Sequence, residues 1–102
     1  SRVKEEILRV LEARGYIAGF EKKGKKVRKF LEVRLRYDGA VPAMEGFRRL
    51  SRPSRRLYFG ARALKPVRQG AGLLIVSTSH GLMAGEEARK AKVGGEVIAE
   101  VW

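Results

Sequence analysis

Three hydroxyl side chains, one imidazole and one glycine follow each other late in the chain, in the segment Ser77-Thr78-Ser79-His80-Gly81. The segment ends a run of aliphatic residues, so its polar groups are expected at the end of a buried strand. Hydroxyls and exposed backbone N–H groups in such a place suit phosphates, ribose 2′-OH groups and base edges. An ordinary polar turn is the alternative interpretation.

A Ser–His–Asp triad is the other chemistry that these residue types allow. The chain has one histidine and no cysteine, and Asp38 is its only aspartate. Ser79 and His80 are neighbours in sequence and would face opposite sides of a strand, and no nucleophile-elbow pattern surrounds the serine. We therefore predict no catalytic residue, no metal site and no cofactor, and a protein that is not an enzyme.

A run of arginines forms the second candidate site. Arg48-Arg49, Arg52 and Arg55-Arg56 interleave with Phe47, Leu50, Leu57 and Tyr58. Guanidinium groups pair with phosphates and aromatic rings stack on bases, and RNA binding needs both. Arg56 and Tyr58 are expected on one strand face, where they would lie along RNA. A solvated arginine surface is the alternative.

The positive charge is concentrated in the middle of the chain. The 102 residues carry 23 Lys and Arg against 11 Asp and Glu, a formal net charge of +12. Residues 20–39 carry a net charge of +5 and residues 43–72 one of +7, whereas residues 73–102 carry −1. A generally solvated basic surface would show a more even spread. Because 44% of the residues are hydrophobic, the chain can also bury a core. The sequence therefore predicts a folded protein that binds a polyanion.

The first part of the chain must hold a helix and two strands. Val3, Ile7 and Leu11 follow one helical face, with Ser1 as the cap and Gly15 at the end. Strands are expected over residues 16–22 and 27–37, joined by a hairpin turn over residues 22–26 in which Gly24 takes a positive φ. Residues 38–43 contain a glycine and a proline and are interpreted as a linker.

The second part must position both candidate sites. Strands are expected over residues 47–52 and 55–59 around a turn at Pro53, and over residues 73–79 and 96–102. A helical turn over residues 61–65, a short helix over residues 86–91 and a turn at Gly94-Gly95 complete the pattern. The pattern is therefore that of a mixed protein of the α+β fold class.

Three segments, in this order, resemble the bacterial form of the small-subunit ribosomal protein S8 family. They are Leu50 to Pro53 running into Arg55-Arg56-Leu57-Tyr58, Gly72 to Gly81, and Glu87-Ala88-Arg89 with Gly94-Gly95-Glu96 to Trp102. The motif Ser77-Thr78-Ser79-x-Gly81, with Gly94-Gly95-Glu96 after it, is the specific part. Gly15-Tyr16-Ile17 matches the strand after the family's second helix, so the family's first helix and strand would precede Ser1. Lys92 departs from the pattern, because it stands at a usual glycine position.

The resemblance implies a structural constituent of the small ribosomal subunit that binds a helical element in the central domain of small-subunit rRNA and supports its assembly. The resemblance also implies two small mixed α/β subdomains, residues 1–42 and residues 43–102, of which the C-terminal one would make the principal RNA contacts. By position, these contacts would come from Ser77, Thr78, Ser79, His80 and Gly81 at the RNA minor groove, from Gly94, Gly95 and Glu96 beside them, and from Arg52, Arg55, Arg56 and Tyr58 on their flank. Neighbouring small-subunit ribosomal proteins would be its other partners, with no small-molecule substrate and no membrane.

Two points stay open in the sequence. An RNA-binding translational regulator that acts on mRNA outside the ribosome is the alternative function. It is implied by analogy, since related bacterial proteins also bind a similar hairpin in their own mRNA and repress its translation. The ribosome is bacterial and cytoplasmic, or organellar in a mitochondrion or plastid. The longest aliphatic run, Leu73 to Val76, is far shorter than the ~20 residues that span a bilayer.

Overall fold

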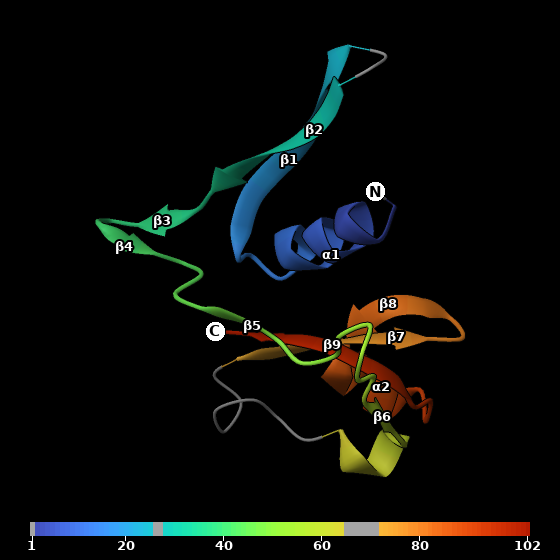
Figure 1. The fold of residues 1–102 in the computed structure, drawn as a ribbon. Coiled ribbons are helices and arrows are strands. Elements are labelled where there is room, and N and C mark those ends of the chain that lie inside the picture. The colour runs from blue at the N-terminus through green and yellow to red at the C-terminus, as the bar shows by residue number, and fades with distance from the viewer. Residues whose placement is uncertain (1, 26–27, 65–71) are drawn as a thin grey trace. The chain divides into compact units, whose positions relative to one another are not determined.

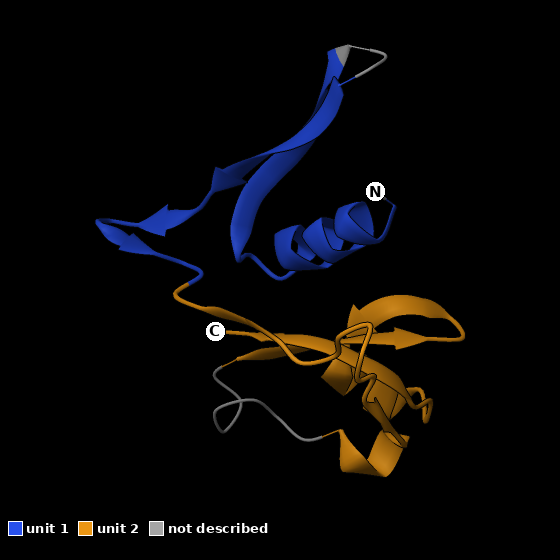
Figure 2. Cartoon of the chain, in the orientation of Figure 1, with its two compact units in different colours: residues 1–44 blue, residues 45–102 orange. Residues whose placement is uncertain are grey.

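The computed structural model describes residues 2–25, 28–64 and 72–102. The α+β fold class expected from the sequence is confirmed (Figure 1). The chain forms two compact units, residues 1–44 and residues 45–102 (Figure 2). None of the helices in these described ranges is long and apolar enough to cross a membrane.

The first unit opens with helix α1 (Arg2–Ala13), as the spacing of its apolar residues predicts. Leu11 is buried on this face. Gly15 ends the helix with a φ of +79°, and its N–H donates to the Glu12 carbonyl at 3.0 Å. The Tyr16 N–H donates to the Leu11 carbonyl at 2.9 Å, which completes a Schellman motif. The predicted cap, Ser1, lies outside the described residues.

Strands β1 (Ile17–Lys25) and β2 (Arg28–Leu35) form an antiparallel hairpin. The turn predicted over residues 22–26 is wrong at its start, because β1 stays paired through Lys25. Gly24 does take a positive φ of 109°, but it lies within the strand, opposite Lys29. A Cβ atom there would overlap the Arg28 carbonyl oxygen, so only glycine fits this pairing. Residues 26 and 27, including the expected start of the second strand, lie outside the described residues.

The predicted linker is wrong as well. Strand β3 (Tyr37–Asp38) pairs with β4 (Val41–Pro42) in a second, short hairpin that takes up most of this stretch. Gly39 has a φ of +68° at its tip, and the Ala43 N–H donates to the Arg36 carbonyl at 2.8 Å at its base. Glycine and proline therefore mark a tight turn and an edge strand here, which is the other structure that they favour.

The second unit is built on a five-stranded antiparallel sheet. Its path is β5 (Phe47–Arg49), β9 (Gly95–Val101), β7 (Leu73–Thr78) and β8 (Gly81–Ala84), and β6 (Tyr58–Phe59) also pairs with β9. Helix α2 (Gly85–Lys90) packs on β7 and β8 of this sheet, and the 3-10 helix η1 (Ala61–Ala63) packs on α2. Leu64, Val76, Ala88 and Val97 form a buried core between the sheet and these helices. The predicted end of the helical turn, Lys65, lies outside the described residues.

Two expectations for this unit need correction. Strands were expected over residues 47–52 and 55–59, but only three residues of the first and two of the second are paired, as β5 and β6. Both strands pair with β9, and only one isolated bridge, between Arg52 and Arg55, joins the segments to each other. Strand β8 was not predicted, because its four residues carry no alternation and run directly into α2.

Candidate nucleic-acid interface

The hydroxyl segment forms a tight turn at one end of the sheet. Ser77 and Thr78 end β7, Ser79 and His80 make the connection, and Gly81 opens β8 with a φ of +104°. The His80 N–H donates to Thr78 Oγ1 at 3.0 Å, and the Thr78 hydroxyl donates to the Gly81 carbonyl at 2.9 Å. Ser79 and His80 are exposed, and the Ser79 hydroxyl makes no hydrogen bond within the described ranges. Thr78 therefore fixes the turn, while Ser79 presents a free hydroxyl.

Gly94 and Gly95 lie beside this turn, because Gly95 pairs with Thr78 across β7 and β9. A Cβ atom on Gly95 would overlap the Ser77 carbonyl oxygen, and one on Gly94 would lie 2.8 Å from the Gly60 Cα. The two glycines thus allow β9 to approach both β7 and the segment after β6. Close packing of the backbone therefore accounts for glycine at both positions.

Glu96 lies in a row of three residues that crosses the sheet. Its partner on β7 is Ser77 and its partner on β6 is Tyr58, so all three side chains share one face. The Glu96 side chain is only 14% exposed, and its Oε1 lies 3.4 Å from Nη1 of Arg56. Tyr58 is 65% exposed. The row therefore joins a hydroxyl, a carboxylate and an open aromatic ring.

Arg56 reaches this row by a different route from the one predicted. It precedes β6, so the expectation that Arg56 and Tyr58 lie on one strand face is wrong. The two residues nevertheless come together, since Glu96 pairs with Tyr58 through the backbone and with Arg56 through its carboxylate.

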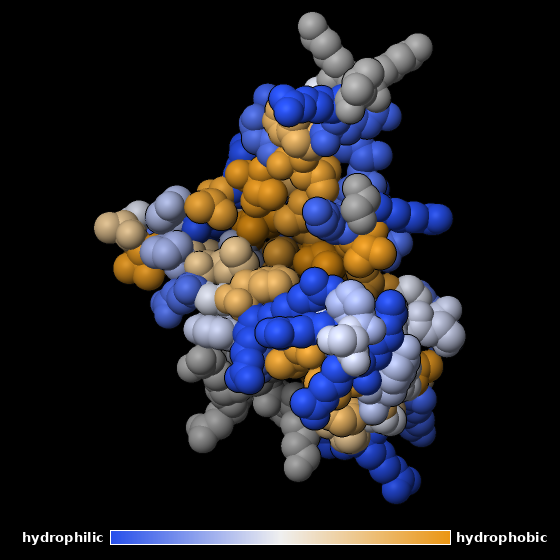
Figure 3. All heavy atoms as spheres, viewed as in Figure 1, coloured by the Kyte–Doolittle hydropathy of each residue, from blue (hydrophilic) through white to orange (hydrophobic). Residues whose placement is uncertain are grey.

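Arg52 and Arg55 close the turn around Pro53 that the sequence predicted. The Arg52 N–H donates to the Arg55 carbonyl at 2.8 Å, and the Arg55 N–H donates to the Arg52 carbonyl at 2.9 Å. Both side chains are exposed and neither has an ion-pair partner in the described part of the chain. Figure 3 shows hydrophilic side chains over the visible side of this second unit.

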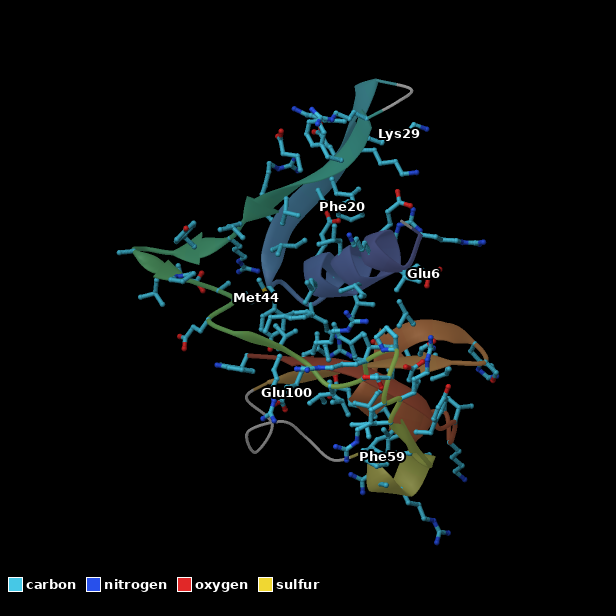
Figure 4. All side chains as sticks on the ribbon, viewed as in Figure 1. Glu6, Phe20, Lys29, Met44, Phe59 and Glu100 are labelled. Atoms are coloured by element: carbon cyan, nitrogen blue, oxygen red, sulfur yellow. The ribbon has the colours of Figure 1, made fainter. Side chains whose placement is uncertain are left out.

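Sequence reasoning missed two residues of the site. Ser51 is 3% exposed, and its hydroxyl accepts a hydrogen bond from the Leu57 N–H at 2.9 Å, which anchors the arginine turn. Phe59 is 45% exposed and pairs with Gly95, so it adds an exposed ring at this end of the sheet, on the opposite face of β6 from Tyr58 (Figure 4). The aromatic pair was visible in the sequence, whereas nothing there separates a buried serine from an exposed one.

The arrangement offers hydrogen-bond donors, cations and rings around one sheet end. Among the residues described, no group of three His, Asp or Glu side chains could hold a metal ion. His80 contacts the Thr78 hydroxyl through its backbone N–H, and Asp38 lies in the other unit, on β3. These donors and rings suit phosphate, ribose and base contacts.

The whole chain, residues 1–102, matches the family model of ribosomal protein S8. The chain belongs to the ribosomal protein S8 family. The resemblance expected from the sequence is thereby confirmed. This is a family of structural proteins of the small ribosomal subunit and not of enzymes.

Relatives named small ribosomal subunit protein uS8 match over the full chain. The protein from Thermus thermophilus is 44% identical over 110 residues, which cover 100% of this chain and 80% of the relative. The protein from Mycoplasmopsis agalactiae is 45% identical over 102 residues, and that from Mycoplasma mycoides is 41% identical; both alignments cover 100% of this chain and 78% of the relative. Membership in the S8 family makes this a ribosomal protein.

Proposed function

We propose that this chain is a structural constituent of the small ribosomal subunit that binds a helical element in the central domain of small-subunit rRNA and supports its assembly. The second unit, residues 45–102, is the principal RNA-binding part. Its partners beyond the rRNA are neighbouring proteins of the same subunit. The chain acts by holding RNA in shape and performs no chemistry on it.

The observation that supports this proposal most directly is the meeting of four features at one sheet end. The hydroxyl turn at Ser79, the glycine pair before Glu96, the ring of Tyr58 and the ion-paired Arg56 are joined by backbone pairing or by a side-chain contact. Two of these residues, Arg56 and Glu96, are separated by 40 positions in the sequence. A turn that only closes a hairpin would not require a glycine pair, an aromatic ring and an arginine beside it.

Each group has a role that RNA chemistry requires. The Ser79 hydroxyl and nearby backbone N–H groups contact 2′-OH groups and base edges in the shallow minor groove of A-form RNA. Tyr58 offers a face on which a base or ribose packs. The exposed arginines neutralise phosphates, which supplies affinity for any RNA. Selection of one RNA then depends on the fixed turn.

Replacement of Ser79 by alanine tests the role of the turn. We expect Ser79→Ala to weaken binding to the cognate rRNA fragment about five-fold, because one exposed hydrogen bond is worth about 1 kcal/mol. Filter binding or calorimetry with a fragment of the central domain measures this change. An unrelated RNA duplex of equal length is the control and should be bound as tightly by the variant as by the parent.

Equal affinity of parent and variant for the cognate fragment would contradict the assigned role of the turn. Co-sedimentation of the tagged chain with small ribosomal subunits checks the ribosomal role itself. A chain recovered only with free mRNA would instead support the translational regulator.

A further inference from the structure

The first unit contains an open pocket that the proposed RNA contacts of the second unit leave unused. Its volume is about 420 Å³ and its lining residues are Lys4, Lys22, Lys29, Phe30 and Leu31. Three of these five residues are lysines, and they come from α1, β1 and β2. Segments far apart in the sequence thus bring three ammonium groups to one hollow.

The register of the hairpin shows which side chains share a face. Lys22 pairs with Leu31, and Gly24 pairs with Lys29 two residues further along each strand. Because strand side chains alternate, Lys22, Leu31 and Lys29 lie on one face of the hairpin. Phe30 falls on the other face with its partner Lys23.

The two faces differ in how their cations are neutralised. On the Lys23 face, Lys23 Nζ lies 3.3 Å from Glu32 Oε1, and Arg34 Nη1 lies 3.2 Å from Glu21 Oε1. On the pocket face, Lys22 Nζ lies 2.9 Å from Glu5 Oε1. Lys4 and Lys29 have no ion-pair partner in the ranges that the structure describes. On the opposite face Lys23 and Arg34 are ion-paired and Arg28 has no partner in the described ranges, whereas two of the three pocket lysines have none.

Glu5 limits this excess charge without removing it. The hydrogen bond from Lys22 lowers the pKa of the Glu5 carboxyl, which is therefore ionised at neutral pH. Three lysines against this one carboxylate leave a local charge of +2. Ammonium groups act as point charges that bind phosphate oxygens from several directions.

We propose that Lys4 and Lys29, together with Lys22, bind a phosphate group of an RNA strand in this pocket. The naming of RNA as the source of the phosphate rests on the proposed function. The pocket is larger than one phosphate group, and the side chain of Leu31 offers an apolar surface to the attached sugar or base. Figure 4 labels Lys29 on β2, and this residue lies nearer the tip of the hairpin than the labelled Phe20 on β1.

The first test needs no ribosomal RNA. Nuclear magnetic resonance of the labelled full chain is followed during titration with uridine 5′-monophosphate and, as control, with uridine. We expect the nucleotide to shift the amide signals of Lys4, Lys22 and Lys29, and uridine to shift them far less. The variant Lys4→Gln/Lys29→Gln should lose these shifts while its other signals stay in place. Equal shifts with both ligands, or none with the nucleotide, would overturn the proposal of a phosphate site.

The second test asks whether the site takes part in RNA binding. In the Lys4→Gln/Lys29→Gln variant, the magnitude of the slope of log affinity for the rRNA fragment against log salt should fall by about one, the value for one lost phosphate contact. The matched control, Lys23→Gln/Arg28→Gln, removes two charges from the opposite face of the same hairpin and should leave the slope unchanged.

The two proposals fail in different ways. An unchanged slope in the pocket variant, with normal binding by the parent, would overturn the RNA source of the phosphate and leave the proposed function intact. A parent chain that prefers no rRNA fragment over an unrelated RNA would overturn the proposed function, while the nucleotide titration would still decide the phosphate site.

Discussion

Lys92 has a backbone conformation that residues with a side chain rarely adopt. Its φ is +60°, and it follows Ala91, the C-cap residue of α2. The Lys92 N–H donates to the Arg89 carbonyl at 3.1 Å and the Val93 N–H donates to the Ala88 carbonyl at 2.9 Å. This is the hydrogen-bond pattern that Gly15 completes at the end of α1, but with a lysine at the position where glycine fits best.

Lys92→Gly should therefore raise the free energy of unfolding by about 0.5 to 1 kcal/mol. A left-handed residue with a Cβ costs roughly 1–2 kcal/mol, and the greater freedom of glycine in the unfolded chain takes back part of this gain. Urea unfolding measured by circular dichroism gives the difference. The control Lys90→Gly removes the same charge from the last helical residue and should lower stability by about 0.5 to 1 kcal/mol. A destabilised Lys92→Gly variant would show that the lysine side chain itself holds this segment.

The helices and strands could be predicted from the sequence wherever a single local rule determines them. Apolar spacing and Gly15 predicted α1, and the continuous aliphatic run predicted β7. Strand β8 and the β3–β4 hairpin could not be predicted, because strands of two to four residues are stabilised by their neighbours and not by their own sequence pattern. The expected strand over residues 55–59 is mostly loop, since hydrogen bonds to Ser51 and β9 replace regular pairing there.

The same distinction applies to the candidate site. The residue types of the hydroxyl turn indicated its chemistry, and the aromatic residue beside the arginines was also visible. The contact of Arg56 with Glu96 was not, because it joins two positions that no periodicity relates. The structural reason for Gly95 was equally hidden, since only the strand pairing shows that the Ser77 carbonyl lies where a Cβ would be.

One ion pair ties α1 to the hairpin of the first unit and makes its stability depend on pH. Lys22 donates a hydrogen bond to Glu5, which lowers the pKa of that carboxyl in the folded chain. A carboxyl whose folded-state pKa is lower than its unfolded one stabilises the fold above the unfolded pKa, and the effect is lost as pH falls through the folded pKa.

Glu5→Gln should consequently lower the free energy of unfolding at pH 7, and the gap to the parent should close as pH falls below about 4.3, the ordinary glutamate value. Urea unfolding of both chains between pH 7 and pH 3 measures this gap. Glu12→Gln, an exposed carboxyl on the same helix, is the control and should show a smaller gap. A Glu5→Gln gap that stays constant with pH would mean that the glutamate acts through packing.

At the scale of the whole molecule, the charge and the candidate turn occupy different stretches of the chain. Residues 43–72 carry a net charge of +7, while residues 73–102, which hold the hydroxyl turn and Glu96, carry −1. Phosphate contacts supply affinity that is independent of sequence, and contacts to base edges and ribose select the RNA. This division predicts that affinity for any RNA and selection of one RNA respond to different substitutions.

Arg52→Gln/Arg55→Gln should weaken binding to the cognate rRNA fragment and to an unrelated RNA by the same factor. Both side chains are exposed and unpaired within the described ranges, whereas Arg56 would release Glu96 if replaced. The slope of log affinity against log salt should fall by about one to two for either RNA, because up to two phosphate contacts are lost. Titrations at several salt concentrations measure both effects. Arg2→Gln/Arg9→Gln, which removes the same charge from α1, separates the local contact from the change in net charge. A loss confined to the cognate fragment would mean that the arginine turn takes part in selection, since a phosphate contact alone cannot distinguish one RNA from another.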